Sequence, residues 1–597
     1  QNFTSATNTY NTAVGNNAGL SVTTGIQNTL IGALAGDALT TGQENVALGY
    51  GALGGDDVGN HSTALGWNAL ISQNYATSTD SNNTAVGWNA GSSISTGTTN
   101  TVVGSHTGDA ITVGHHNTAL GMAALSADTK GSNSIAIGSY ALTTQNFTTA
   151  TDVYNTGVGY NAGAAITTGF YNTLIGGLAG DALTDADQNT AVGLNALSSD
   201  TLGSKSTAIG QAALFSQNFT TATDSHNTGV GYNAGVNVTT AIRDTLIGSE
   251  AGDALTTGQD NVAVGALALS GDTAGNQSVA IGRGALKVQN FSTSTTASNV
   301  AVGYSAGESV TTGIRLTYIG ATAGDASTHA SDNVAVGADA LGVNVGGQNV
   351  VAVGTKAMKD FNVASGNTYN TVVGSYAGQS LTTGTNNTFI GGLASQNTTT
   401  GSNNVLIGTS AETAAVDTSQ VIAIGSSITS QAANNFTFGF GSTDSNIAFG
   451  GTSITAPSDE RYKEEIATST AGLSFINDLR PVTFKWKKAK DIPSDHDSYI
   501  ADGEDGCDDR VMLSNGETNH GFIAQEVKAA IDAHSEIKDG FRMWSEDYRE
   551  DADGNKIADN RQRVAPSELI PILTKAIQEL SAEVETLKTK VAALEAE

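Results

Sequence analysis

The five residues Asn11-Thr12-Ala13-Val14-Gly15 return throughout the first three quarters of this 597-residue sequence. The first four copies start 17 residues apart, and a step of 21 leads to the fifth copy at Asn83. Three steps of 17 and one of 21 make a superrepeat of 72 residues, which restarts at positions 155, 227 and 299 and, one residue early, at 370. There are 24 copies up to Gly425. A short fixed period indicates stacked repeats, because one unit cannot bury a core alone.

Each copy has the pattern of one short strand followed by a turn. Its fourth position is Val, Ile or Leu in all 24 copies, and its second is mostly Thr or Val. Side chains two apart share one face of a strand, so we expect positions two and four to form a buried aliphatic column. The glycine at position five permits a positive φ. Stacked at about 4.8 Å, the 24 turns predict a rod on the order of 115 Å long.

These repeats resemble the left-handed parallel β-roll of trimeric adhesin heads of the YadA type and of related phage fibres. The nearest matches are residues 133–138 and 278–282, and the resemblance covers most of residues 11–450. It implies that three chains associate side by side. The predicted fold class is therefore mainly β: a parallel, left-handed β-roll or solenoid, followed by a small α/β domain that ends in a coiled-coil helix.

The four extra residues of each superrepeat fall in segments that begin with Gln, Asn and an aromatic residue. We expect longer loops at four-turn intervals, whose rings and amides suit weak, multivalent contacts with glycans. The alternative is that each ring packs over its own loop. The candidate rings for surface binding are Tyr75, Phe147, Phe219 and Phe291.

Composition changes at Pro457, the first of the five prolines. Residues 1–457 hold 8 of the 26 Lys and Arg and 26 of the 56 Asp and Glu, so they carry −18 and the remaining residues −12. Two acidic parts argue against a nucleic-acid partner, and no segment reaches the roughly 20 apolar residues of a membrane span. The single Cys507 excludes a disulfide framework and a cysteine metal cluster, and no metal or other cofactor is expected. Because the sequence begins at Gln1, we expect a leader or attachment module to be missing.

Beyond Pro457 the pattern predicts mixed helix and strand. Residues 482–486 alternate as a strand, and residues 521–527 run from a turn into a strand or the start of a helix. The polar stretches 493–518 and 545–560 are expected to be exposed hairpins or loops.

Heptad spacing from Pro571 onward predicts a coiled-coil helix with two apolar seam positions. β-Branched residues facing Leu favour two strands in isolated peptides, but we expect the symmetry of the attached fibre to prevail. The seam residues are Leu573, Leu580, Leu587 and Leu594 at one position, and Ile577, Val584 and Val591 at the other.

Four motifs in order resemble the intramolecular chaperone domain of endosialidases and other phage tail fibres, the peptidase S74 family. They lie at residues 458–463, 479–486, 520–527 and 568–580. The resemblance implies a trimerisation chaperone that cuts itself from the fibre at the Pro457–Ser458 bond.

The same resemblance implies the residues of the cleavage site. Ser458 matches the nucleophile and Lys463 the general base of a Ser–Lys dyad. The residues expected to support the site are Pro457, Asp459, His520, Gln525 and Glu526. The alternative is a domain that folds the fibre but stays uncut.

Together these features predict a homotrimeric bacteriophage tail fibre or tailspike that binds a glycan or protein receptor on the host surface. It would be assembled in the host cytoplasm, joined to the tail or baseplate through the missing N-terminal part, and located on the virion. A bacterial trimeric surface adhesin is the alternative, and a glycan-degrading tailspike is a third reading. Only self-cleavage is expected as enzymatic activity. The predicted boundaries are 1–450 for the shaft, 451–457 for a linker, 458–570 for the chaperone and 571–597 for the coiled-coil helix.

Overall fold

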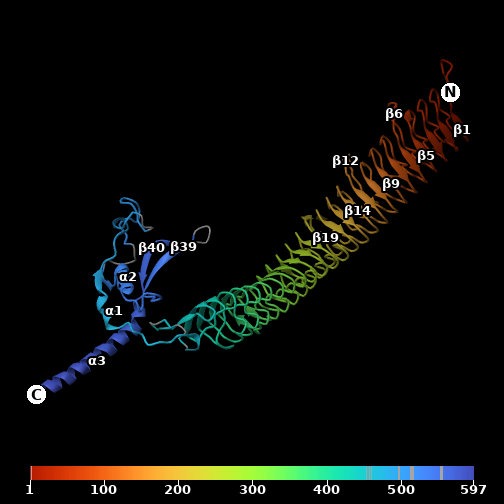
Figure 1. The fold of residues 1–597 in the computed structure, drawn as a ribbon. Coiled ribbons are helices and arrows are strands. Elements are labelled where there is room, and N and C mark those ends of the chain that lie inside the picture. Colours follow the sequence, from red (N-terminus) through yellow and green to blue (C-terminus); the bar gives the residue numbers. More distant parts are fainter. Residues whose placement is uncertain are drawn as a thin grey trace. The chain divides into compact units, whose positions relative to one another are not determined.

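A computed structural model describes residues 1, 3–451, 454–455, 458, 460–494, 498–510, 517–550 and 556–596. The chain divides into two compact units, Gln1–Pro457 and Ser458–Glu597. The first is a parallel solenoid of about 25 turns, drawn from red to cyan in Figure 1. This confirms the mainly β fold class that the 17-residue repeat predicts.

Each turn contributes one strand to a 26-stranded sheet, and equivalent repeat positions pair in register, as in Thr173 with Thr190. All neighbouring pairs are parallel except the last, β35 with β36, which is antiparallel. The strands are β1 (Thr12–Val14), β2 (Thr29–Ile31), β3 (Val46–Leu48), β5 (Thr63–Leu65), β7 (Thr84–Val86), β8 (Thr101–Val103), β9 (Thr118–Leu120), β11 (Ile135–Ile137), β13 (Thr156–Val158), β14 (Thr173–Ile175), β15 (Thr190–Val192), β17 (Thr207–Ile209), β19 (Thr228–Val230), β20 (Thr245–Ile247), β21 (Val262–Val264), β23 (Val279–Ile281), β25 (Val300–Val302), β26 (Thr317–Ile319), β27 (Val334–Val336), β29 (Val351–Val353), β31 (Thr371–Val373), β32 (Thr388–Ile390), β33 (Val405–Ile407), β34 (Val421–Ser426), β35 (Asn435–Phe440) and β36 (Ser445–Ala448).

The long loops add short parallel ladders beside this sheet, one at each superrepeat. Each pairs two residues of the fourth turn with two residues of the loop that follows it. The paired strands are β4 (Gly59–Asn60) with β6 (Thr79–Asp80), β10 (Gly131–Ser132) with β12 (Thr151–Asp152), β16 (Gly203–Ser204) with β18 (Thr223–Asp224), β22 (Gly275–Asn276) with β24 (Thr295–Thr296), and β28 (Gly347–Gln348) with β30 (Gly366–Asn367).

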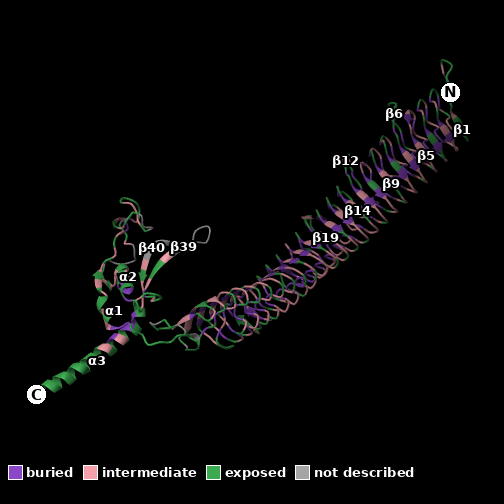
Figure 2. Cartoon of the chain, viewed as in Figure 1, coloured by how far each residue is buried: buried purple, intermediate pink, exposed green. Residues whose placement is uncertain are grey.

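The strands bury the third position of the repeat, and not the second and fourth. In β14 the order is half-buried Thr173, buried Leu174 and exposed Ile175. The third position is mostly Ala or Gly, because leucines and isoleucines of the turns, such as Leu39 and Ile94, already fill the interior of the narrow coil. The expected burial of positions two and four is therefore wrong within one chain, although the strand alternation that suggested it is correct. Figure 2 shows this mixture of buried and exposed residues along the shaft.

The glycine at position five is required where consecutive turns stack. Gly159 has a φ of +139°, and a Cβ added there would lie 2.3 Å from the carbonyl oxygen of Gly176 on the next turn. A side chain at this position would therefore force neighbouring turns apart.

The asparagine at position one links consecutive turns through its buried side chain. Asn172 Nδ2 donates to the carbonyl oxygen of Ala186 at 2.8 Å, and the backbone N–H of Asn189 donates to Asn172 Oδ1 at 2.9 Å. An amide both donates and accepts, so one side chain satisfies two buried backbone groups. In the sequence alone, this asparagine is only a marker of the repeat.

Asp244 occupies the same position one superrepeat after Asn172. Its Oδ1 accepts from the N–H of Asn261 at 2.8 Å, whereas its buried Oδ2 has no hydrogen-bond partner. Burial is the main cause that raises the pKa of the Asp244 carboxyl to about 8. Only the protonated acid can donate as the asparagine amide does.

We predict that Asp244→Asn stabilises the shaft and removes a pH dependence of its stability. The unfolded chain loses this proton near pH 4 and the folded chain near pH 8, so wild-type stability falls as pH rises between those values. The free energy of unfolding of the variant should exceed that of the wild type by about 1–3 kcal/mol at pH 8.5 and by little at pH 4. Unfolding rates in guanidinium chloride at both pH values measure this, with Asn172→Asp as the reciprocal variant. An equal gain at the two pH values would contradict the prediction.

The second unit, Ser458–Glu597, has a small core between three helices and a hairpin. Phe475 of α1, Val527 of α2, Met543, Leu569 and Ile572 of α3 are buried together. The elements are η1 (Glu460–Tyr462), α1 (Leu473–Asp478), β37 (Val482–Phe484), η2 (Ala489–Asp491), β38 (Asn519–Gly521), α2 (Ala524–Ala533), β39 (Trp544–Glu550), β40 (Lys556–Val564), η3 (Pro566–Leu569) and α3 (Ile570–Glu595). Strands β37 and β38 pair antiparallel, as do β39 and β40.

The helix that the heptads predict is present as α3, which with η3 spans 30 residues. Strand β37 forms from the first three residues of the predicted strand at 482–486, and residues 521–527 run from β38 into α2. Among the described residues, no helix is long and apolar enough to cross a membrane.

Candidate functional site

The structure brings Ser458 and Lys463 together at the start of the second unit. The 3-10 turn η1 lies between them, and the N–H of Lys463 donates to the carbonyl oxygen of Glu460 at 3.0 Å. This turn reverses the chain, so that Lys463 Nζ donates to Ser458 Oγ at 2.7 Å. Residues five apart in sequence therefore form a hydrogen-bonded pair.

A serine and a lysine at this distance can act as nucleophile and general base. The amine must be neutral to accept the hydroxyl proton, and burial favours the neutral form. Both side chains are exposed in the single chain. The geometry of a dyad is thus present in one chain, without the desolvation that would activate it.

The expected supporting residues are only partly accounted for. Pro457 and Asp459 lie outside the described residues. His520 is exposed on β38 opposite Thr483 of β37, and Gln525 is exposed in the first turn of α2. Glu526 follows in α2.

Glu526 has a structural partner in the second predicted motif. Arg480 Nε donates to Glu526 Oε2 at 2.9 Å, and Arg480 Nη2 donates to Glu526 Oε1. These hydrogen bonds lower the pKa of the Glu526 carboxyl. Glu526 therefore joins α2 to the segment before β37, a role that the motif alone did not indicate.

A carboxylate of α3 caps the start of α1. Leu473 N–H donates to Glu579 Oε2 at 2.8 Å, and a Cβ on Gly472 would lie 2.3 Å from the same oxygen. Glycine at 472 therefore permits the close approach of α3. The contact connects the terminal helix to the core of the second unit across 106 residues of sequence.

His534 forms a second link between the end of α2 and α1. Its Nε2 lies 2.8 Å from Asp478 Oδ2, and its Nδ1 lies 3.0 Å from Glu536 Oε1. Both ring nitrogens can donate only in the protonated imidazolium. The hydrogen bond to Asp478 is the main cause that raises the pKa of His534. We call the contacts of His534 with Asp478 and Glu536 the His534 clamp. Neither this clamp nor the Glu579 cap can be predicted from one sequence, because both depend on tertiary packing.

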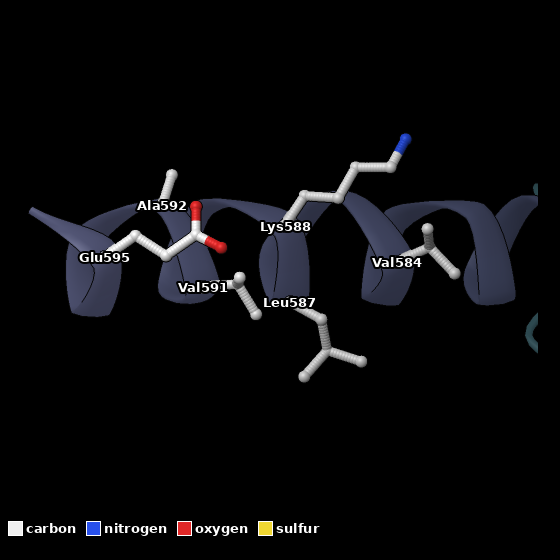
Figure 3. A pocket seen from close by; sticks show the side chains of 6 residues that line it. All are labelled: Val584, Leu587, Lys588, Val591, Ala592 and Glu595. Atoms are coloured by element: carbon white, nitrogen blue, oxygen red, sulfur yellow. The ribbon is translucent and has the colours of Figure 1, made fainter.

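The far part of α3 presents an unpaired apolar seam. Ile572 and Ala576 are buried in the unit, whereas the predicted seam residues from Ile577 onward are exposed. Figure 3 shows the side chains of Val584, Leu587 and Val591 on this helix, with no other described element packed on them. An exposed heptad seam is what a coiled-coil helix shows before its partners bind.

The candidate aromatic rings of the long loops are not on the surface. Tyr75 is 4 % exposed, and Phe147, Phe219 and Phe291 are 6–7 % exposed. The expectation that these rings contact a glycan is therefore corrected, and burial favours the alternative in which each ring packs over its own loop.

A buried polar cluster holds each of these loops in place. In the third superrepeat, Gln217 Nε2 donates to Asp200 Oδ2 at 2.6 Å and to Ser206 Oγ at 2.8 Å. The N–H of Phe219 donates to Asp200 Oδ1 at 3.1 Å, which draws the ring inward, and Asn227 Nδ2 donates to Gln217 Oε1 at 2.9 Å. The loop ring is buried because its backbone is tied to a buried carboxylate.

The fifth copy replaces this cluster as a set. The fifth superrepeat has Asn344, Val350 and Phe361 at the positions that Asp200, Ser206 and Gln217 occupy in the third superrepeat. Phe361 and Val350 are fully buried, and Asn344 bonds to Gly347. The acid, the amide that donates to it and the hydroxyl that accepts from that amide are lost together, because a buried polar group left without its partner would be unsatisfied.

Comparison with known proteins assigns part of the second unit. Residues 458–535 match the family model described as chaperone of endosialidase, peptidase S74, so this segment is a chaperone-of-endosialidase domain. No curated protein and no solved structure matches the chain. The match begins at Ser458, where the second compact unit also begins.

Proposed function

We propose that this protein is a homotrimeric, surface-binding fibre whose C-terminal domain assembles three shafts and then cuts itself free at Pro457–Ser458. The observation that carries the proposal is the aliphatic column at repeat position four, which faces outward along the shaft. The chaperone-of-endosialidase domain at 458–535 belongs to a family associated with trimerisation.

The outward column is too long to suit a free monomer. It has a Val, Ile or Leu on each of 24 turns, and members such as Leu48, Ile175 and Ile390 are exposed. Monomeric proteins rarely expose contiguous apolar patches beyond a few hundred Å². Two further copies of the chain could bury this column, because each presents the same column at the same spacing.

The shaft gives the C-terminal domain a physical task. Chains with nearly identical 17-residue turns can associate one turn out of step, and their non-local contacts close slowly. A domain that first joins three C-terminal ends would set the register, and the exposed seam of α3 offers the contact. Burial of the Ser458–Lys463 pair on assembly would then couple cutting to trimerisation. The released shaft would persist through its slow unfolding.

Within this proposal the fibre is a bacteriophage tail fibre or tailspike that attaches to a host-surface receptor from the virion. A bacterial trimeric adhesin with the same chaperone is the second candidate, which the shaft geometry accommodates equally. A glycan-degrading tailspike is the third, and release of reducing ends from host polysaccharide would identify it.

The test is the mass of the native assembly with and without the C-terminal domain. Light scattering should give about 181 kDa for three uncut chains of 60.4 kDa each, or a correspondingly smaller trimer once the domain has left. A chain that ends at residue 457 should not form soluble trimers when expressed alone. A monomeric wild type would overturn the trimer, and normal trimers from the shortened chain would overturn the chaperone role.

A further inference from the structure

The shaft carries a second set of aromatic rings, and these are exposed. Trp88, Tyr160, Tyr232 and Tyr304 are 49–57 % exposed and lie 72 residues apart. Each follows the repeat glycine on the first turn after a long loop. Because equivalent positions stack in register, the rings recur every four turns, about 19 Å apart. We call these four residues the aromatic ladder.

Neighbouring side chains hold most of the ladder rings. His106 meets Trp88 edge to face at 4.4 Å between ring centroids, and Tyr140 meets Tyr160 at 6.4 Å. The Arg283 guanidinium lies 5.9 Å from the centroid of the Tyr304 ring. A ring that is already held loses little conformational freedom when it binds a ligand.

An amide stands beside the first three rings of the ladder. Asn89, Asn161 and Asn233 are half-buried, and their φ values of 53–56° are left-handed. Within the described part of the chain, these three side-chain amides form no hydrogen bond. The backbone N–H of Asn161 donates to the carbonyl oxygen of Ser139 at 3.1 Å. This bond fixes the backbone of Asn161, while its side-chain amide remains free to bind a ligand.

A flat apolar ring next to a free amide suits a sugar, which presents an apolar C–H face and hydroxyls at its edge. The charge of the shaft argues against an acidic sugar polymer, because residues 1–457 carry −18 and would repel a polyanion. Regular spacing along one rod further favours a polymer over a single small molecule.

We propose that the aromatic ladder is a binding track for a neutral polysaccharide. The proposal rests on the proposed role as a surface-binding fibre and names the ligand class for it. Each ring and its amide bind one segment weakly, and four sites on each chain give the affinity through multivalency.

The test is affinity electrophoresis of the full-length protein in gels that contain dextran, mannan, galactan or, as the polyanion, alginate. At least one neutral polymer should retard the wild type. Each single ring-to-alanine change should weaken retardation about three- to tenfold, and the change of all four rings should abolish it. The matched control is Met122→Ala with Leu194→Ala, which removes exposed apolar side chains from the same repeat position and spares the rings.

Three results of the electrophoresis would overturn the proposed binding track. They are no retardation by any neutral polymer, retardation by alginate alone, and equal loss in the control and the four-ring variant. Light scattering on the same samples separates this test from the proposed function. A four-ring variant that fails to trimerise would place the rings between chains and contradict the proposal. A monomeric wild type that still binds the polymer would overturn the trimer and leave the ladder standing.

Discussion

Ser458→Ala should leave the chain in one piece. Wild-type protein on a denaturing gel should give a C-terminal fragment of about 14 kDa, the share of 60.4 kDa that 140 of 597 residues represent. Without the hydroxyl that accepts a hydrogen bond from Lys463 Nζ at 2.7 Å, no nucleophile remains and the fragment should disappear. Cleavage should fall at least 1,000-fold, as expected for loss of a catalytic nucleophile.

A lysine variant separates base chemistry from charge. Lys463→Arg keeps a positive charge beside Ser458, but a guanidinium does not give up its proton in proteins. It should therefore abolish cleavage while native light scattering still shows a trimer. The matched control is Ser469→Ala, which removes another serine hydroxyl from the same unit and should be cut normally. An intact wild type would contradict self-cleavage and leave chaperoning open, whereas a fragment from Ser458→Ala would exclude Ser458 as the nucleophile.

The repeat made the shaft predictable, but not which face of its strands is buried. Strand, turn and in-register stacking follow from local chemistry, such as the Gly159 turn and the Val, Ile or Leu at position four. Alternation says that two faces differ without saying which one faces inward. That choice depends on the space left by turn residues such as Leu39, which periodicity does not measure.

The loops show the same limit for binding residues. Sequence spacing selected Phe219 as a surface ring, whereas the exposed ring is Tyr232, thirteen residues later. Phe219 is buried because Asp200 holds its backbone N–H, a contact between residues 19 apart that no local pattern reveals. The exposed rings share one sequence feature, an aromatic residue directly after the repeat glycine on turns that have no extra residues to fold over it.

The proposed cleavage site was indicated by a family motif and not by the spacing of its residues. Spacing alone does not place Ser458 beside Lys463, since residues five apart meet only where the chain turns, here through η1. The Glu579 cap of α1 and the His534 clamp were not predicted, because each joins segments 56 to 106 residues apart.

Acidic substitutions on the outward column should prevent assembly. Ile175, Ile247 and Ile319 occupy position four of equivalent turns, 72 residues apart, and each is 38–39 % exposed in the single chain. Changing all three to Asp would place nine carboxylates in the contacts of a trimer, where a buried unpaired charge costs several kcal/mol. The trimer should become undetectable by light scattering at micromolar concentration, and only chains of about 60 kDa should remain.

The control must carry the same added charge away from the strand face. Met122→Asp, Leu194→Asp and Val288→Asp replace exposed apolar residues of the turns and should leave the trimer intact. A milder set, Ile175→Thr, Ile247→Thr and Ile319→Thr, guards against unfolding, because threonine already occupies position two of many of these strands. It should weaken the trimer about 10- to 100-fold per position across three chains, while circular dichroism retains the β signal. If the aspartate set still gave trimers, the outward column would not be the interface, and the chains would have to associate through another face of the shaft.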